Sequence, residues 1–378
     1  MLKKILVINS APDKNTLLLR TFKELSRRDF LFNLWSQEFT LLNEFKKNSW
    51  PASRVFIGPE LVDLGRISLF FLILPLLQLK FFFALASLKI KHRLDLIICL
   101  DFKEKIIVSL PAVLLGVKIV WLEGPELNYR KINRLIFWLY RLNGRLARLI
   151  VFTNYAKTQL TALGFKENKI KLISPGSKVP QYQENIFNKL AAANQAGFHK
   201  KYFTIGAITG LNQKQKIEMI FQAVKTCLPV IANLQLIIVG EGEERKNLSW
   251  LAKKMEIENL VWLVGEQEQL KKWLDSFDIF LVPGDSLKLN DYGNILEAMA
   301  VGLPILAPRN LGLEDLVLEN KTGSFFEAGN NEMLSRQIIK LHQDKKLRAY
   351  LGKNGQEQVD RFFTLDKMVA EIADILRN

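Results

Sequence analysis

Short runs of β-branched and other apolar residues alternate with longer helical stretches along this chain of 378 residues. Runs that are apolar on both faces are typical of the strands of a parallel sheet, which helices cover on both sides. We expect such strands at Ile5–Ile8, Leu94–Cys99, Val117–Trp121, Leu149–Phe152, Ile170–Ile173, Phe203–Ile208, Leu234–Val239, Leu260–Leu263, Ile279–Val282 and Ile305–Ala307. The sequence therefore predicts an α/β fold with two parallel sheets.

The length and the restart of this pattern in the second half predict two domains, each large enough to bury its own core. We place the first domain at residues 1–180 and the second at 181–363, with Pro175–Lys201 as the connection. A last helix at about Leu365–Leu376, within the segment 364–378, is expected to pack back on the first domain.

The few cysteines and histidines argue against a metal centre. Cys99 and Cys227 lie far apart in apolar runs, too few for a disulfide framework or a thiolate site. His92, His199 and His342 are equally scattered. We therefore expect no metal and a reducing compartment. The apolar run near the N-terminus is too short for the core of a signal peptide, so we interpret it as the first strand.

The net charge of +15 is concentrated in the first half. Residues 1–180 contain 29 Lys and Arg against 13 Asp and Glu, whereas residues 181–378 contain 24 against 25. One domain alone is thus expected to meet an anionic partner, which is a membrane surface, a nucleic acid or an acidic substrate. No arginine-glycine repeat, zinc-finger spacing or ribonucleoprotein motif is present, so we predict no nucleic acid.

The stretch Ile67–Ile90 is the most hydrophobic in the chain and is long enough to span a bilayer. Pro75, Gln78 and Lys80 lie at its centre, where a lysine costs roughly 2.5–3.5 kcal/mol on insertion scales. Three interpretations stay open: a membrane span, a crossover helix in the core, or a helix at the membrane interface.

The stretch Lys131–Arg148 has the spacing of an amphipathic helix, with leucines on one face. Its other face is expected to carry Arg134, Trp138, Arg141, Arg145 and Arg148. This stripe is either a solvated face of a sheet-covering helix or a surface for a membrane or an acceptor.

Glycines follow two strands of the second half, at Gly240 and Gly265, where they permit tight turns and close approach of a ligand. Further on, Gly293 precedes a predicted helix at about Asn294–Val301. The free N–H groups at the start of that helix would form an anion site at the carboxyl edge of the sheet. Glu297, one turn later, could accept hydrogen bonds from a diol such as a ribose, or be a solvated helix residue.

The order of motifs in the second half resembles GT-B-fold glycosyltransferases, in particular glycosyltransferase family 4 (glycosyl transferases group 1). The resemblance extends over about Phe203–Phe363, and more loosely over Leu163–Gly176. The matching segments are Ile238–Gly242, Phe277–Pro283, Glu297–Ile305, Leu311–Glu314, Lys321–Phe326 and Leu347–Gly355.

The resemblance implies two Rossmann-like domains that face each other across a cleft. It implies a retaining, metal-independent transfer of a sugar from a nucleotide diphosphate sugar of UDP or GDP type, with no tightly bound cofactor. The acceptor would be a lipid-linked or cell-envelope glycan, and the protein would be cytoplasmic and peripheral on the inner face of the cell membrane.

The resemblance also assigns residues. The donor would be bound by Glu297, Gly293, Asn294, Ile295, Gly206, Gly240 and Gly265. Leu289 occupies the place of the family's first glutamate, so Asp291 is the candidate substitute. Ala207 stands where the family has a phosphate-binding arginine, which leaves Lys214 or Lys216 as the cation. Glu123 and Glu126 follow a middle strand where the family has a histidine, and Glu123 is the candidate catalytic group there.

Two other functions remain open. One is a non-catalytic protein that keeps the nucleotide pocket but has lost the cations for the leaving group. The other is a sugar-nucleotide epimerase of the same fold, which would need a set of carboxylates and histidines in the cleft.

Overall fold

The computed structural model describes residues 2–11, 15–61, 64–125, 133–178, 202–267, 269–284, 287–310 and 312–377. The chain divides into two compact units, Met1–Ser174 with Met368–Asn378, and Pro175–Lys367. The end of the chain thus belongs to the first unit. The predicted boundary at residues 180 and 181, and the predicted connection from residue 179 onward, lie outside the described residues.

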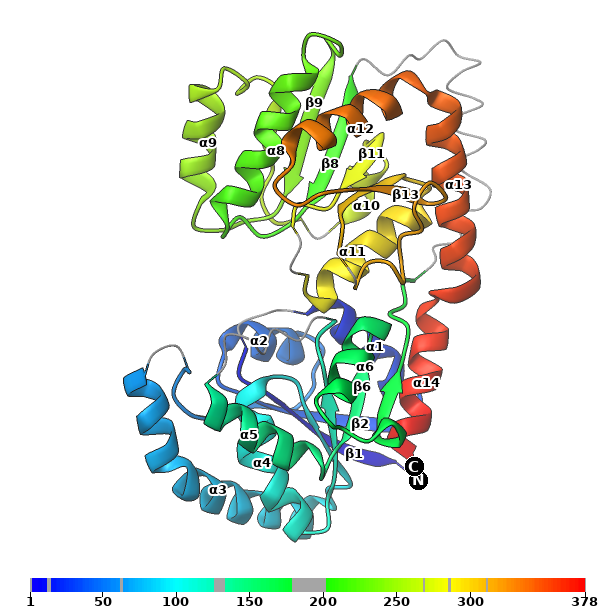
Figure 1. Cartoon of the computed structure of the whole chain (residues 1–378). Helices are drawn as coiled ribbons and strands as arrows, with labels where there is room; N and C mark the ends of the chain where they lie inside the picture. The colour runs from blue at the N-terminus through cyan, green and yellow to red at the C-terminus, as the bar shows by residue number, and fades with distance from the viewer. Residues whose placement is uncertain are drawn as a thin grey trace. The chain divides into compact units, whose positions relative to one another are not determined.

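The first unit is built on a seven-stranded parallel sheet in the order β3-β2-β1-β4-β5-β6-β7 (Figure 1). Its strands are β1 Lys3–Asn9, β2 Phe30–Ser36, β3 Ala52–Arg54, β4 Leu96–Cys99, β5 Lys118–Leu122, β6 Arg148–Val151 and β7 Ile170–Leu172. Its helices are α1 Thr16–Ser26, α2 Phe39–Lys47, α3 Leu64–His92, α4 Phe102–Leu114, α5 Arg134–Gly144, α6 Asn154–Ala162 and the returning α14 Leu365–Arg377.

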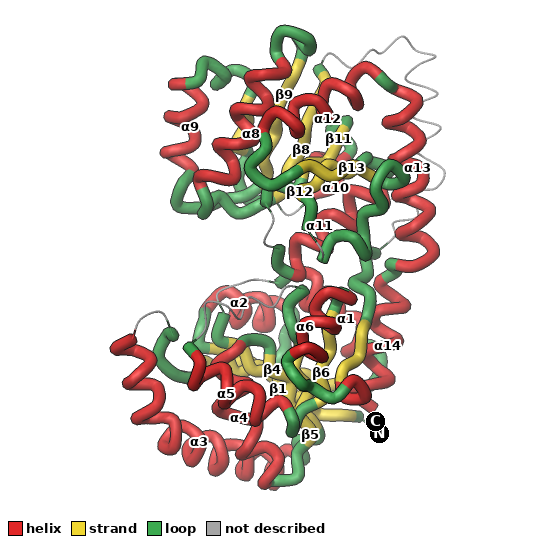
Figure 2. The backbone as a smooth tube through the Cα atoms, viewed as in Figure 1, coloured by secondary structure: helices red, strands yellow, loops and turns green. Residues whose placement is uncertain are grey.

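The second unit is built on a six-stranded parallel sheet in the order β10-β9-β8-β11-β12-β13, with helices on both faces (Figure 2). Its strands are β8 Phe203–Ile208, β9 Leu234–Val239, β10 Val261–Leu263, β11 Ile279–Leu281, β12 Ile305–Pro308 and β13 Gly323–Phe326. Its helices are α8 Lys214–Cys227, α9 Arg245–Lys254, α10 Leu270–Leu274, α11 Leu289–Ala300, α12 Asn331–Gln343 and α13 Lys345–Phe362.

The predicted α/β class with two parallel sheets is confirmed, and each of the ten expected strands is present within one or two residues of its predicted ends. Three strands were missed. In β2 buried positions alternate with more exposed ones, so it lacks the continuous apolar run that marks the central strands. β3 has three residues that are at most half-buried, and β13 opens with a glycine.

The hydrophobic stretch at Ile67–Ile90 is the crossover helix α3, which connects β3 to β4. One face of α3 packs in the core, through Phe70, Leu74, Leu77, Phe81 and Leu85. Two of the polar residues at its centre bond to protein backbone: Gln78 Nε2 donates to Ile106 O (3.5 Å), and Lys80 Nζ donates to Phe56 O (3.1 Å). By length and composition alone, Gly65–His92 could also cross a membrane.

The Ser174–Gly176 segment lies where the chain first passes between the two units, and the structure explains its glycine. Ser177 N donates to Phe363 O, and Leu365 N donates to Ser177 O, each at 2.8 Å. A Cβ atom on Gly176 would lie 2.4 Å from Thr364 O, so this pairing requires a glycine. The two stretches at which the chain passes between the units are therefore tied together.

Helices α11 and α13 of the second unit approach each other at two glycines. Gly302, just after α11, has a φ of +81°, and a Cβ atom on Gly352 of α13 would lie 1.9 Å from Gly302 O. At Gly355, one turn further along α13, a Cβ atom would lie 3.7 Å from Met299, which is an ordinary contact. This contact fixes α11 against α13.

The α11–α13 contact predicts opposite effects for two glycine substitutions on one helix. Gly352→Ala should lower the free energy of unfolding by about 1–3 kcal/mol, because the extra methyl overpacks the contact. Gly355→Ala should leave it unchanged or raise it by up to about 1 kcal/mol through helix propensity. Urea denaturation of both variants tests this; equal stability of the two would contradict the packing argument.

Candidate active site

The order of strands in the second unit reverses between β8 and β11, so the carboxyl ends of these strands define its switch point. Open α/β sheets bind ligands outside the carboxyl ends at such a point. Around it, the loops after β8, β9 and β10 are packed on one another. Leu211 N donates to Glu241 O, and Gly240 N donates to Gly265 O, each at 2.9 Å.

Two of the predicted donor-site glycines serve this loop packing. Gly240 has a φ of +148°, and a Cβ atom there would lie 1.9 Å from Thr209 O. Gly265 has a φ of +78°, and a Cβ atom would lie 2.9 Å from Glu241 Oε1. Both therefore shape the carboxyl edge of the sheet, and their direct contact with a donor stays a prediction.

The structure places Gly206, a predicted donor-site residue, and Ala207 inside β8 and not in the loop that follows it. Both are buried within β8, and a Cβ atom on Gly206 would lie 1.9 Å from the ring of Phe277. Gly206 is therefore a packing glycine, and Ala207 lies in the core of the second unit. The loop after β8 begins at Thr209, one residue beyond the strand's end.

The predicted start of the anion-binding helix is also wrong. α11 begins at Leu289, not at Asn294, because Asp291 caps it: Asp291 Oδ2 accepts from Lys288 N at 2.8 Å. The first turn of the helix, whose N–H groups point out of the helix end, therefore begins at Leu289. Gly293 and Asn294 lie inside the helix.

The site candidates on α11 differ in their surroundings. Ile295 packs in the core with its side chain, so it cannot line a donor site through that side chain. Asn294 is buried, and Glu297 is partly exposed two turns into the helix. Leu289 is buried at the first helical position, so no carboxylate stands where the family's first glutamate belongs. Asp291 is partly exposed and shares its carboxylate with the cap.

Of the two candidate lysines, Lys216 lies at the switch point. A Cβ atom on Gly284, just after β11, would lie 2.6 Å from Lys216 Nζ, so the lysine side chain rests on the backbone there. Lys214 is the first residue of α8. Arg309, another cation beyond a strand end, is paired with Glu319 at 2.9 Å and Glu314 at 3.7 Å. Of these three cations, Lys216 is the one whose side chain lies at the switch point, and its contact with a diphosphate stays a prediction.

The first unit has its own switch point, between β1 and β4, and carboxyl groups gather there. Ser10 Oγ lies 2.7 Å from Glu104 Oε2 and 3.0 Å from Asp101 Oδ2. Glu104 Oε1 accepts from Asp101 N, which caps α4. Burial, and then the charge of Asp101, raises the pKa of Glu104 to about 7.

Glu123, the predicted catalytic group after β5, is in a buried ion pair with Lys105, with Nζ and Oε2 2.9 Å apart. Lys105 Nζ also donates to Leu122 O at 2.7 Å. Glu123 Oε1 is buried and has no hydrogen-bond partner among the described residues. Glu126 lies outside the described residues. A signal for Glu104 and Lys105 existed in the Asp-Phe-Lys-Glu-Lys sequence directly after β4, and our interpretation missed it.

The predicted arginine stripe spans more than one element. α5 ends at Gly144, Arg145 is its C-cap, and Arg148 opens β6, where it pairs with β5. Only Arg134, Trp138 and Arg141 thus lie on the helix, although all five side chains are exposed. Lys131 lies outside the described residues. The residues that the structure describes contain no cluster of His, Cys, Asp and Glu that could hold a metal ion.

Comparison with known proteins agrees with this arrangement. Residues 188–358 match the family model of the glycosyl transferases group 1. The predicted resemblance to this family is confirmed. The chain is 26% identical to the N-acetyl-alpha-D-glucosaminyl L-malate synthase of Bacillus anthracis over 176 residues. This match covers 45% of each of the two chains. It is 24% identical over 271 residues to the amylovoran biosynthesis glycosyltransferase AmsK of Erwinia amylovora, covering 70% of this chain and 64% of AmsK.

The chain thus spans less than two thirds of both of these curated relatives. The crystal structure of HepE from Anabaena in complex with UDP superposes on it with a TM-score of 0.79. HepE is 18% identical, and the superposition covers 100% of both chains. This similarity confirms the GT-B fold.

Glu104 predicts a pH dependence of stability in the first unit. Its folded-state pKa, about 7, lies above its ordinary value of 4.5. Between these values the folded state binds more protons than the unfolded state, so the free energy of unfolding falls as the pH rises, by roughly 2–4 kcal/mol. Glu104→Gln keeps the cap and should remove this fall. Urea denaturation at pH 5 and pH 8 measures it, and an unchanged pH dependence in the variant would contradict the assignment.

Proposed function

We propose that this protein is a metal-independent, retaining glycosyltransferase that acts in the synthesis of a cell-envelope polysaccharide. It would move a sugar from a nucleotide diphosphate sugar to a lipid-linked or glycan acceptor. The observation that carries the proposal is the position of Lys216 against Gly284 at the switch point of the second sheet. UDP is the first nucleotide to test, because the similar HepE structure is a complex with UDP.

In this proposal the diphosphate lies between Lys216 and the first turn of α11. The positive end of the α11 dipole, at its N-terminal turn, favours an anion there. Glu297, two turns further, would accept hydrogen bonds from the ribose hydroxyls. The cation and the amides stabilise the negative charge that develops on the leaving diphosphate.

The transfer then breaks the bond between the anomeric carbon and the diphosphate oxygen and forms a bond from that carbon to the acceptor oxygen. The acceptor's proton leaves with the diphosphate. The carboxyl groups at the switch point of the first unit, those of Glu104 and Glu123, are proposed to hold acceptor hydroxyls, because a carboxyl oxygen can accept hydrogen bonds from hydroxyl groups.

The donor site predicts a specific effect of Lys216. Lys216→Ala should lower kcat for transfer or for sugar-nucleotide hydrolysis by about 10²-fold or more, because the variant lacks the cation that stabilises the negative charge on the leaving diphosphate. Lys225→Ala, an exposed lysine near the end of the same helix, is the matched control and should have no effect. Unchanged turnover in Lys216→Ala would remove this lysine from the mechanism, and absence of turnover in the wild type would favour the non-catalytic alternative.

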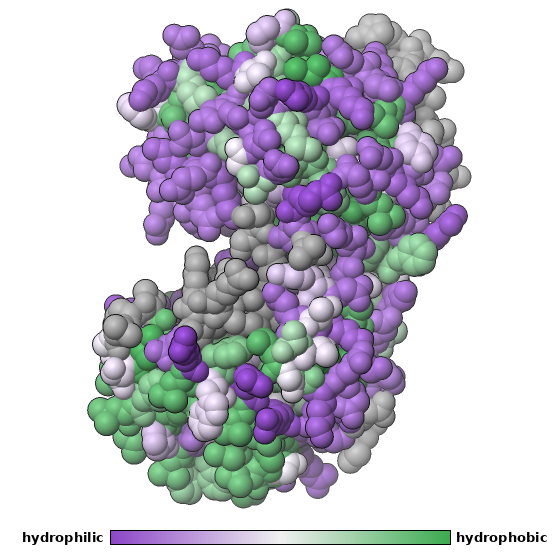
Figure 3. Space-filling view, in the orientation of Figure 1, coloured by the Kyte–Doolittle hydropathy of each residue, from purple (hydrophilic) through white to green (hydrophobic). Residues whose placement is uncertain are grey.

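We further propose that the first unit docks on an anionic membrane through α3, α4 and α5. The outward face of α3 is apolar, with Leu72 76% and Leu76 67% exposed. Leu110 and Leu114 of α4 and Trp138 of α5 are exposed as well, and Figure 3 shows hydrophobic side chains gathered on this part of the unit. The arginines of the predicted stripe are exposed on the same unit, and each contributes about 1 kcal/mol near anionic lipid.

Sedimentation with vesicles tests the docking. The protein should pellet with anionic but not with neutral vesicles, and the double variant Leu72→Glu, Leu76→Glu should stay in the supernatant, because it puts charge into the contact. Val230→Glu, at an exposed apolar residue of the second unit, is the control. High salt should weaken the binding. Equal recovery with both lipids would leave the face without a membrane role.

A further inference from the structure

The second unit has a groove at the β10 edge of its sheet, apart from the proposed donor site. α10 follows β10 but has only five residues, so it leaves part of the β9–β10 face uncovered. This groove has a volume of about 700 Å³, which is within the range of ligand sites, about 300–1,000 Å³. None of its lining residues comes from β8, α8 or α11, the elements of the donor site.

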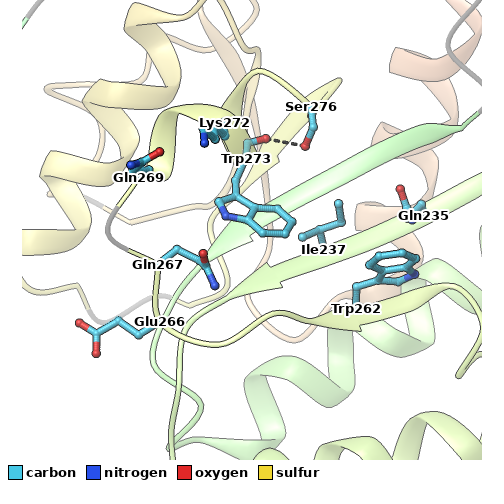
Figure 4. Close-up of a pocket in the computed structure, with 9 residues that line it drawn as sticks. All are labelled: Gln235, Ile237, Trp262, Glu266, Gln267, Gln269, Lys272, Trp273 and Ser276. Carbon is cyan, nitrogen blue, oxygen red and sulfur yellow. Dashed lines mark hydrogen bonds between the residues drawn. The ribbon is translucent and has the colours of Figure 1, made fainter.

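Two indole rings and three side-chain amides line this groove. Trp273 of α10 and Trp262 of β10 lie on either side of Ile237, and Gln235 and Gln267 lie toward its two ends (Figure 4). Trp262 is 52% exposed, although it is a large aromatic residue at the middle of a strand. The position of Gln267 is fixed, because its Nε2 donates to Val264 O at 2.9 Å.

This combination matches the chemistry of a sugar chain. A pyranose ring has a face of C–H groups, which pack on the electron-rich face of an indole, and hydroxyls at its rim. Side-chain amides can donate and accept hydrogen bonds, as sugar hydroxyls do. Of the charged side chains on the lining, one is acidic and one is basic, Glu266 and Lys272. Residues 181–378 are nearly neutral, so a polyanion gains nothing here.

We propose that this groove binds a neutral glycan chain at a site separate from the donor site. It would hold sugar units of an acceptor or product away from the point of transfer and so raise the affinity for long chains. In that role it rests on the proposed function, but the binding itself does not require transfer to occur.

An array of immobilised neutral oligosaccharides of glucose, galactose, mannose and N-acetylglucosamine tests the groove with the full-length protein. The wild type should be retained on at least one of them. Trp262→Ala, at a half-exposed position, should lose at least tenfold in affinity. Trp250→Ala is the matched control: Trp250 is 61% exposed on α9, and Lys254 lies 5.4 Å from its ring centroid.

Calorimetry with UDP separates this proposal from the proposed function. The affinity of Trp262→Ala for UDP should equal that of the wild type. No retention of the wild type on the array, or equal retention of Trp262→Ala, would overturn the glycan site. Weaker UDP binding by Trp262→Ala would also overturn it, since the groove would then belong to the donor site. Failure of UDP to bind the wild type would instead count against the proposed function.

Discussion

Both sheets of this protein are parallel, and a parallel sheet must be covered by helices on both faces. Two surfaces that we interpret as functional arise where a covering helix is apolar on its outer face or is too short to cover its strands. α3 covers the first sheet with one apolar face and presents a second apolar face outward. α10 is too short to cover β9 and β10 fully, and a groove with two indoles remains. The helical cover thus explains both the proposed membrane face and the proposed glycan groove.

The two switch points carry different sets of charged groups. In the first unit three acidic side chains and two buried lysines, Lys103 and Lys105, lie at or beyond the ends of β1, β4 and β5, and burial keeps the pKa of Glu104 high. In the second unit the switch point has Lys216 and the amide end of α11, both suited to an anion. This division fits a transfer enzyme in which one unit binds the charged donor and the other binds hydroxyls.

The sequence was sufficient to predict the central strands, because they are apolar on both faces, whereas β2 and β3 lie near the edge and lack that pattern. It was sufficient to predict that Gly240 and Gly265 shape the loops, since a positive φ strongly favours glycine over other residues. It failed for Gly206, because a glycine that makes room for the ring of Phe277 is indistinguishable in sequence from one that makes room for a ligand. It also placed the start of α11 at Asn294 and not at Leu289, because the hydrogen bond from Lys288 N to the Asp291 side chain was not evident from the residue types. Lys216 could be separated from Lys214 only by its contact with Gly284, which joins two distant parts of the chain.

The central claim is that a nucleotide diphosphate binds at the switch point of the second sheet. Amide hydrogen exchange of the full-length protein, with and without UDP or GDP, tests it most directly. The account predicts slower exchange of the amides at Thr209–Lys216 and Leu289–Asn294 when the correct nucleotide is added. It also predicts that Glu297→Ala weakens this protection, by on the order of 1.5–3 kcal/mol in binding free energy. Protection confined to other segments, or none with either nucleotide, would contradict it.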